Sequence, residues 1–236
     1  MIPLHRMDYS PFPLGVIFDL DGTLIDSEAL HKSLTQEIAR SLSYRLSDEE
    51  YYVQLGGLCD VDAMKYLLTA ARRTRSAEEL VALKLGRYLA HLRAGDVKAI
   101  PAVVSYVRSL ADLGVQLALA TNASLTEANA ALELLGLSAI IEIRVSIEMV
   151  TRGKPASDIP FCAARHMRLL PSQCLVYEDS VHGVQAAVDA GMAVVGIGRH
   201  DPWRLLGAGA MRVMADFYGH ELPALPHTLT GESCLT

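Results

Sequence analysis

The chain has 236 residues, of which 51% are hydrophobic and 20% are charged, and its formal net charge is −6. This length suffices for one α/β core and a smaller second domain, and the composition is that of an ordinary globular protein. An acidic chain lacks the basic excess of a general nucleic-acid binder, and no apolar run is long enough to cross a bilayer. We therefore expect no nucleic-acid partner and no membrane partner.

The N-terminal half of the chain contains one strand pattern followed by a long helical segment. Residues 1–13 hold three prolines and no periodic pattern, which predicts a tail. A strand is predicted over residues 15–20, and it stops at the turn signal Asp21-Gly22-Thr23. Residues 29–97 carry three apolar stripes at helical spacing and predict an all-helical insert of three or four helices.

From Pro101 onward, strand and helix patterns alternate. The predicted elements are a helix from 103, a strand over 115–120, a helix opened by the capping box Ser124–Glu127 and closed by Gly136, a strand over 141–146, a helix over 158–169, a strand over 174–178, a helix through 190, a strand over 193–197, a helix from Asp201-Pro202, and a strand over 211–214. Such alternation predicts an α/β, doubly wound and mostly parallel sheet. The core would comprise residues 14–28 and 98–220, interrupted by the insert at 29–97 and flanked by tails at 1–13 and 221–236.

Polar and charged side chains that could take part in catalysis or binding follow four of the predicted strands. They are Asp19 and Asp21, Thr121 and Asn122, Lys154, and Glu178 with Asp179. The carboxyl ends of parallel strands meet at one edge of a sheet, so these groups should converge. Carboxylates from two segments suit Mg²⁺, while the hydroxyl, amide and ammonium groups suit a phosphoryl group. Two carboxylates two residues apart can serve as a nucleophile and a proton carrier.

These residues also carry a family resemblance. Phe18-Asp19-Leu20-Asp21-Gly22-Thr23-Leu24 resembles the first motif of the haloacid dehalogenase-like superfamily, and Thr121-Asn122, Gly153-Lys154-Pro155 and Glu178-Asp179-Ser180 resemble the second, third and fourth. The motifs stand in the family's order, and the resemblance extends over about residues 14–220. It implies a Rossmann-like core, and the helical insert after the first motif resembles the cap of the β-phosphoglucomutase and phosphoglycolate phosphatase branch.

The resemblance also implies roles for individual residues. Asp19 would attack phosphorus and form an aspartyl-phosphate, and Asp21 would protonate the leaving oxygen and then activate water. Thr121 and Lys154 would bind the phosphoryl oxygens, and Asn122 and Gly22 belong to the same phosphate-binding set. Mg²⁺ would be held by the Asp19 carboxylate, the Asp21 backbone carbonyl, Asp179 and Glu178. The string Asp26-Ser27-Glu28-x-x-His31 matches the start of the cap, where His31 is either a substrate contact or a packing residue.

The activity expected is that of a Mg²⁺-dependent phosphatase, a phosphoric monoester hydrolase acting on a sugar phosphate or a phosphoglycolate-like metabolite. One alternative is a phosphomutase, which is disfavoured because the loop Gly56–Asp60 offers an aspartate where a mutase cap commonly has arginine. A second is a phosphonate hydrolase, which requires an extra lysine in the cap, and Lys32 is the nearest candidate. A dehalogenase and a non-catalytic phosphate-binding module are disfavoured because the first does not need Asp21 and the second does not need the intact motifs. We expect a monomer or weak homodimer. The four cysteines show no zinc spacing and predict reduced thiols in a cytoplasmic protein.

Overall fold

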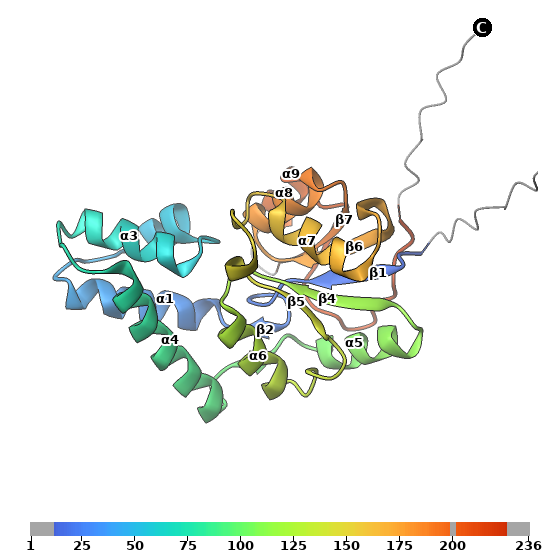
Figure 1. The fold of residues 1–236 in the computed structure, drawn as a ribbon, viewed down its shortest axis with the longest axis horizontal. Coiled ribbons are helices and arrows are strands. Elements are labelled where there is room, and N and C mark those ends of the chain that lie inside the picture. The colour runs from blue at the N-terminus through green and yellow to red at the C-terminus, as the bar shows by residue number, and fades with distance from the viewer. Residues whose placement is uncertain (1–11, 199–201, 226–236) are drawn as a thin grey trace, which may run out of the picture.

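The computed structural model describes residues 12–198 and 202–225. It consists of a layered α/β core with a group of helices beyond one end of its sheet (Figure 1). The core sheet has six parallel strands in the order β5-β4-β1-β6-β7-β8. These strands are β1 Gly15–Phe18, β4 Gln116–Ala120, β5 Ile143–Val145, β6 Cys174–Glu178, β7 Ala193–Ile197 and β8 Arg212–Met214. The predicted parallel fold with an inserted helical segment is confirmed.

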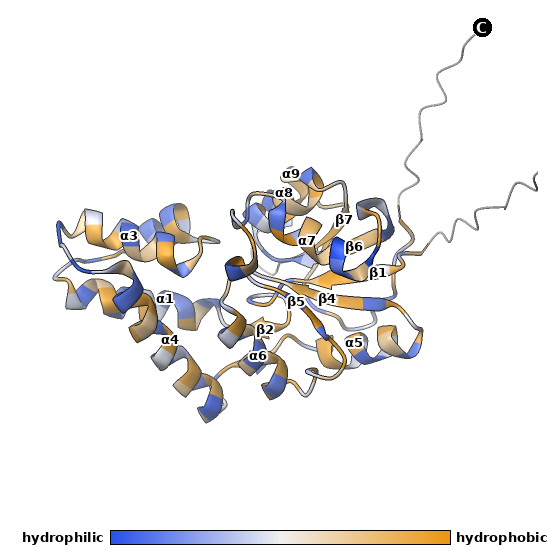
Figure 2. Cartoon of the chain, viewed as in Figure 1, coloured by the Kyte–Doolittle hydropathy of each residue, from blue (hydrophilic) through white to orange (hydrophobic). Residues whose placement is uncertain are grey.

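Helices cover both faces of this sheet. Helices α5 Val103–Asp112 and α6 Leu125–Leu134 cover one face, and α7 Asp158–Met167, α8 Val181–Asp189 and α9 Pro202–Gly207 cover the other (Figure 1). Along β1, Val16 and Phe18 pack toward α5 and α6, while Ile17 packs toward α7 and α8. Both faces of the central strands β1, β6 and β7 are buried, and these strands are almost entirely apolar, whereas β5 and β8 at the two edges each contain an arginine. Figure 2 shows this mostly hydrophobic sheet between its covering helices.

The order of the strands fixes where a ligand can bind. From β1 the chain proceeds to β4 and β5 on one side and then crosses back to β6, β7 and β8 on the other. The direction of winding therefore reverses beside β1, and the carboxyl ends of β1, β4 and β6 border the resulting crevice. Asp19, Thr121 and Asp179 each follow one of these three strands.

The inserted helices have a hydrophobic core of their own. They are α1 Glu28–Ser41, α2 Asp48–Glu50, a π-helical turn at Tyr51–Leu55, α3 Asp60–Ala70 and α4 Ala77–Ala94. Ile38, Met64, Leu67 and Leu80 are fully buried in this cluster. Ser76 caps α4 by accepting a hydrogen bond from Glu79 N, and Gly95 ends the helix in a left-handed conformation. We call these helices the cap.

A short antiparallel strand pair joins the cap to the core. Strand β2, Ile25–Asp26, pairs with β3, Lys98–Ala99, so both crossings between the two parts run side by side. Two-residue strands leave no periodic pattern, and sequence reasoning did not predict them. The first core strand also ends two residues earlier than predicted, because the Leu20 carbonyl accepts hydrogen bonds from Leu24 and Ile25 in a turn.

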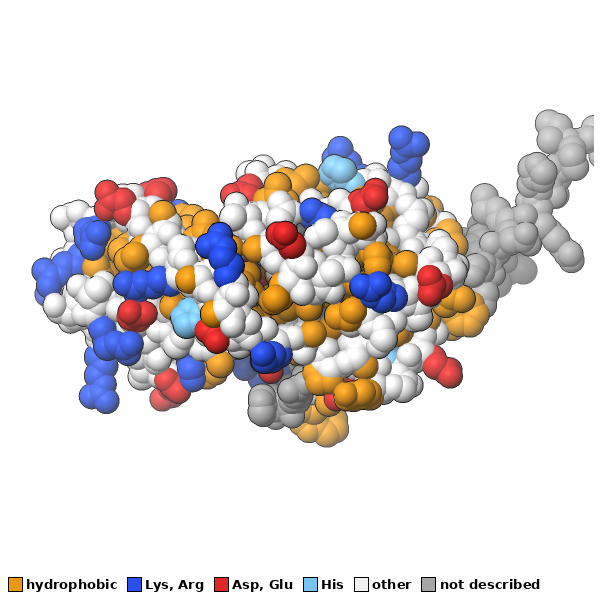
Figure 3. Space-filling model, turned by 90° about the horizontal axis from the view of Figure 1, so that it is seen from below, with side chains coloured by type: hydrophobic (Ala, Val, Ile, Leu, Met, Phe, Trp, Pro, Cys, Tyr) orange, Lys and Arg blue, Asp and Glu red, His pale blue; other side chains and the backbone are white. Residues whose placement is uncertain are grey.

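Most other boundaries agree with prediction within two residues. The Ser124–Glu127 capping box is present, and Gly136 follows α6 with a positive φ of 65°. The predicted cap at Asp201 lies outside the described residues. None of the described helices has the length and apolar character needed to cross a membrane. On the face seen in Figure 3, acidic and basic side chains are interspersed over both cap and core.

Candidate active site

Lys154 contacts charged and polar groups at the carboxyl ends of three strands. Its Nζ donates hydrogen bonds to Asp19 Oδ1 (2.6 Å), Glu178 Oε1 (2.7 Å) and the Ala120 carbonyl (2.8 Å). All three charged residues are at most 8% exposed. Although burial disfavours the ammonium, Asp19 and Glu178 raise the pKa of Lys154, so it stays charged. The loop carrying Lys154 thus links the ends of β1, β4 and β6.

Three carboxylates gather at the same point. Oxygens of Asp19, Glu178 and Asp179 all lie within 4.8 Å of one another. Burial raises the pKa of Asp19 to about 7 even though Lys154 opposes the shift, and burial beside Glu178 and Asp19 raises the pKa of Asp179 well above its usual value. All three side chains offer oxygen ligands, and three carboxylates face the single positive charge of Lys154. These residues therefore fit a hard divalent cation such as Mg²⁺.

Two glycines allow the carboxylates to approach so closely. A Cβ on Gly22 would lie 1.9 Å from Asp179 Oδ2, and Gly22 has a φ of +77°. A Cβ on Gly183, in the first turn of α8, would lie 1.6 Å from Glu178 Oε1. The Gly22 position therefore needs glycine for both space and conformation, and Gly183 needs it for space. Gly22 packs against Asp179 of the acidic cluster, and the phosphate contact expected for it stays a prediction.

The end of β4 places Thr121 and Asn122 beside this cluster. Both line the same cavity as Asp19 and Lys154. The Asn122 side chain accepts a hydrogen bond from Lys154 N (2.9 Å) and donates to the carbonyls of Lys154 (3.2 Å) and Gly57 (3.0 Å). Asn122 thus fixes the Lys154 loop and connects it to the cap loop. Thr121 Oγ1 accepts from Ala123 N, and the threonine is buried.

Asp21 points toward the cap rather than toward the three-carboxylate cluster. Its Oδ1 accepts a hydrogen bond from Ser27 Oγ (2.5 Å) and one from Tyr88 OH (3.3 Å), and it lies 3.0 Å from His31 Nε2. Burial would raise the pKa of Asp21, but His31, Ser27 and Lys84 bring it down to about 2. The pKa of His31 is raised despite its burial, because Asp21 and Asp60 outweigh Lys84. Because Asp21 is ionised, the His31 Nε2–H donates to it, while His31 Nδ1 lies 3.0 Å from Lys84 Nζ and can accept from the lysine.

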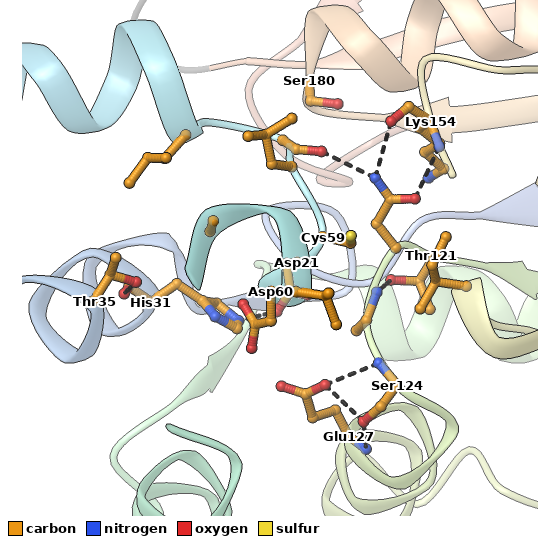
Figure 4. Close-up of a pocket in the computed structure, with 18 of the residues that line it drawn as sticks. Asp21, His31, Thr35, Cys59, Asp60, Thr121, Ser124, Glu127, Lys154 and Ser180 are labelled. Atoms are coloured by element: carbon orange, nitrogen blue, oxygen red, sulfur yellow. Dashed lines mark hydrogen bonds and ion pairs between the residues drawn. The ribbon is translucent and has the colours of Figure 1, made fainter. Parts of the chain in front are cut away.

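The cap adds polar residues, of which sequence reasoning missed Lys84. Lys84 on α4 is 3% exposed, donates to Asp60 Oδ1 and lies 3.0 Å from His31 Nδ1. Figure 4 shows Asp60 and His31 meeting on the cap side of the cavity, opposite Lys154. A sequence pattern could have identified Lys84. It lies in a stripe with Leu80, Tyr88 and Leu92 at a spacing of four residues, and all four side chains are buried. A lysine within an otherwise apolar stripe indicates a polar site.

A cavity of about 280 Å³ lies between the cap and the strand ends. All the residues predicted for the site line it, except Gly22, which packs behind Asp179. His31 of the cap and Asp21 of the core meet directly across it, so the predicted set converges on one chamber. Asp19, Thr121 and Lys154 line the chamber from the core, and His31, Asp60 and Lys84 line it from the cap.

Comparison with known proteins gives one consistent family. The family described as "Haloacid dehalogenase-like hydrolase" matches residues 16–197. Hexitol phosphatase A of Escherichia coli is 29% identical over 186 residues, which cover 78% of this chain and 82% of the relative. A fructose-1-phosphate phosphatase of the same organism is 29% identical over 195 residues, with coverages of 78% and 95%. The crystal structure of CbbY from Rhodobacter sphaeroides in complex with phosphate is 25% identical, with a TM-score of 0.77 and coverages of 87% and 95%.

Proposed function

The chain belongs to the haloacid dehalogenase-like hydrolases, and within that family we propose that it is a Mg²⁺-dependent phosphatase acting on a small phosphorylated metabolite of the sugar phosphate kind. The similarity to phosphatases named for hexitol and fructose phosphates supports hydrolysis of a phosphate ester. The observation that carries the proposal is the contact of Lys154 Nζ with both Asp19 and Glu178 at the point where the sheet reverses its winding.

Asp19 is the proposed nucleophile. Its carboxylate lies at the end of β1, and one of its oxygens is held by Lys154, which leaves the other for attack on phosphorus. The attack forms a bond between this oxygen and phosphorus and releases the alcohol, and water then cleaves the resulting aspartyl-phosphate to phosphate. Lys154 and Thr121 border the space that the phosphoryl oxygens would occupy.

Asp21 is the proposed proton carrier. The leaving oxygen must gain a proton in the first step, and the attacking water must lose one in the second. The His31 Nε2–H donates a hydrogen bond to Asp21 Oδ1 at the boundary between cap and core, so His31 fixes the orientation of the Asp21 carboxylate. His31 therefore serves as a positioning residue for Asp21 in this proposal.

Mg²⁺ would be held by the carboxylates of Asp19, Asp179 and Glu178, with the backbone carbonyl of Asp21 as a further ligand. When bound, the cation would offset the negative charge of the phosphoryl group and of the carboxylates around it. Its presence would also favour the ionised form of Asp19.

We also propose that the cap, residues 29–97, moves relative to the core formed by 14–28 and 98–220. The β2–β3 pair brings both crossings together, and a paired double crossing suits a hinge. Closure would shield the reaction from bulk water, and opening would release the product.

A screen of phosphorylated metabolites, reading released phosphate with Mg²⁺ and again with excess chelator, tests this proposal. We expect one or more monoesters to be hydrolysed only in the presence of the metal. Asp19→Asn, which is nearly isosteric but a poor nucleophile, should be folded and inactive on the same substrates. Full activity in chelator would contradict the metal site, and activity of Asp19→Asn would contradict the nucleophile.

A further inference from the structure

The cap side of the cavity carries a lysine that is already paired. Lys84 lines the cavity, and its Nζ donates a hydrogen bond to Asp60 Oδ1. Its second neighbour is His31 Nδ1, at 3.0 Å. Lys84 is 3% exposed, so bulk water screens this pair weakly. Asp60 therefore neutralises the cation that the cap presents to a bound substrate.

Further acidic groups of the cavity come from both the cap and the core. Beyond the phosphoryl-binding residues, the described lining of the cavity includes Glu28, Glu127 and Glu148 in addition to Asp60. Glu127 is 4% exposed and is held in place by Ser124 N and Oγ, both of which donate to its Oε2. Figure 4 shows Glu127 and Asp60 on neighbouring sides of the same opening. Away from the phosphoryl-binding residues, four carboxylates thus line the cavity together with Lys84 and His31.

This arrangement distinguishes between classes of leaving group. A second phosphate or a carboxylate would be desolvated among like charges and would find Lys84 already engaged by Asp60. Hydroxyl groups are different, because they donate hydrogen bonds to carboxylates without repulsion.

We propose, on the basis of the function given above, that the leaving group is uncharged and rich in hydroxyls. We further propose that Asp60 is a specificity-determining residue that excludes a second anionic group by holding Lys84.

Paired substrates test the inference. For the wild type we compare kcat/KM for a hexose monophosphate and the corresponding hexose bisphosphate, and for glycerol phosphate and phosphoglycerate. The anionic member of each pair should be poorer by at least about tenfold, mainly through a higher KM. Asp60→Asn leaves the Lys84 charge without its partner, so the ratio of kcat/KM between the uncharged and the anionic member of each pair should fall by roughly tenfold.

Two further variants isolate the effect. Asp62→Asn removes the same charge from α3 at a site that is 58% exposed and paired with Lys65, so the ratio should stay as in the wild type. Glu127→Gln removes a cavity carboxylate while keeping a residue compatible with the capping box, so it should lower this ratio even if Asp60→Asn fails to fold.

The outcomes separate this inference from the proposed function. If no phosphate ester is hydrolysed, the proposed function fails. If the wild type hydrolyses both members of each pair equally well, phosphatase activity stands and the inference is overturned. The role of Asp60 also fails if folded Asp60→Asn leaves the ratio unchanged. Where Asp60→Asn does not fold, the inference fails if Glu127→Gln leaves the ratio unchanged.

Discussion

Replacement of Lys154 by methionine tests the electrostatic centre of the site. The lysine side chain is 6% exposed and makes three hydrogen bonds, to Asp19, Glu178 and the Ala120 carbonyl. Methionine fills similar space but leaves two buried carboxylates without a cation. Breaking a buried ion pair from one side costs about 3–5 kcal/mol. We expect Lys154→Met to lose this amount of unfolding free energy in the absence of a divalent cation.

Urea unfolding in excess chelator, followed by circular dichroism, measures the loss. Arg152→Met is the matched control, because Arg152 pairs with Asp158 but its side chain is 71% exposed. Exposed pairs contribute about 0–1 kcal/mol. The difference in unfolding free energy between Lys154→Met and the wild type should become smaller at mildly acidic pH, where the unpaired carboxylates take up protons. A loss below about 1 kcal/mol for Lys154→Met in chelator would refute the reasoning.

Three further changes probe local features of the structure. Gly183→Ala should reduce kcat by about a hundredfold in a folded protein, because the new Cβ would displace Glu178; near-normal turnover would contradict this. Ala102→Gly should raise the unfolding free energy by roughly 0.5–1 kcal/mol in urea, because Ala102 has a left-handed φ of 62°, and a loss of stability would count against strain there. Burial and Arg212 lower the pKa of His220 to about 4, so the unfolded chain binds the extra proton as pH falls from about 6.5 to 4. The melting temperature of the wild type should fall across this window more than that of His220→Gln, and parallel curves would contradict the pKa shift.

The fold could be predicted because the central core strands are apolar runs that end at a turn or at charged residues. Cys174–Glu178 and Ala193–Ile197 were placed to the residue for this reason. The four motifs likewise indicated the family, which the match over residues 16–197 confirms. The β2–β3 pair could not be predicted, because a strand of two residues shows no alternating pattern in the sequence. The pairing also joins segments that are separated in sequence by the whole cap.

The site was predicted in its core half and incompletely in its cap half. Asp19, Lys154 and Glu178 follow strands, and parallel strands bring their ends together whatever the intervening sequence. Which cap residues face the cavity depends on how α1, α3 and α4 pack, and one sequence does not give that packing. Lys84 was missed for this reason, and Asp60 was noted only as the aspartate of the cap loop, without its pairing to Lys84. The bonds by which the Asn122 side chain holds backbone groups of Gly57 and Lys154 were not predicted either.

The central claim is that phosphoryl transfer proceeds through a covalent bond to Asp19. Rapid acid quenching of the enzyme during turnover of a labelled substrate, followed by borohydride reduction and mass spectrometry, tests it most directly. The account predicts labelled protein during turnover, reduction of the acyl phosphate at residue 19, and no labelling of Asp19→Asn. Turnover with no covalent label, together with inversion of configuration at phosphorus, would contradict it.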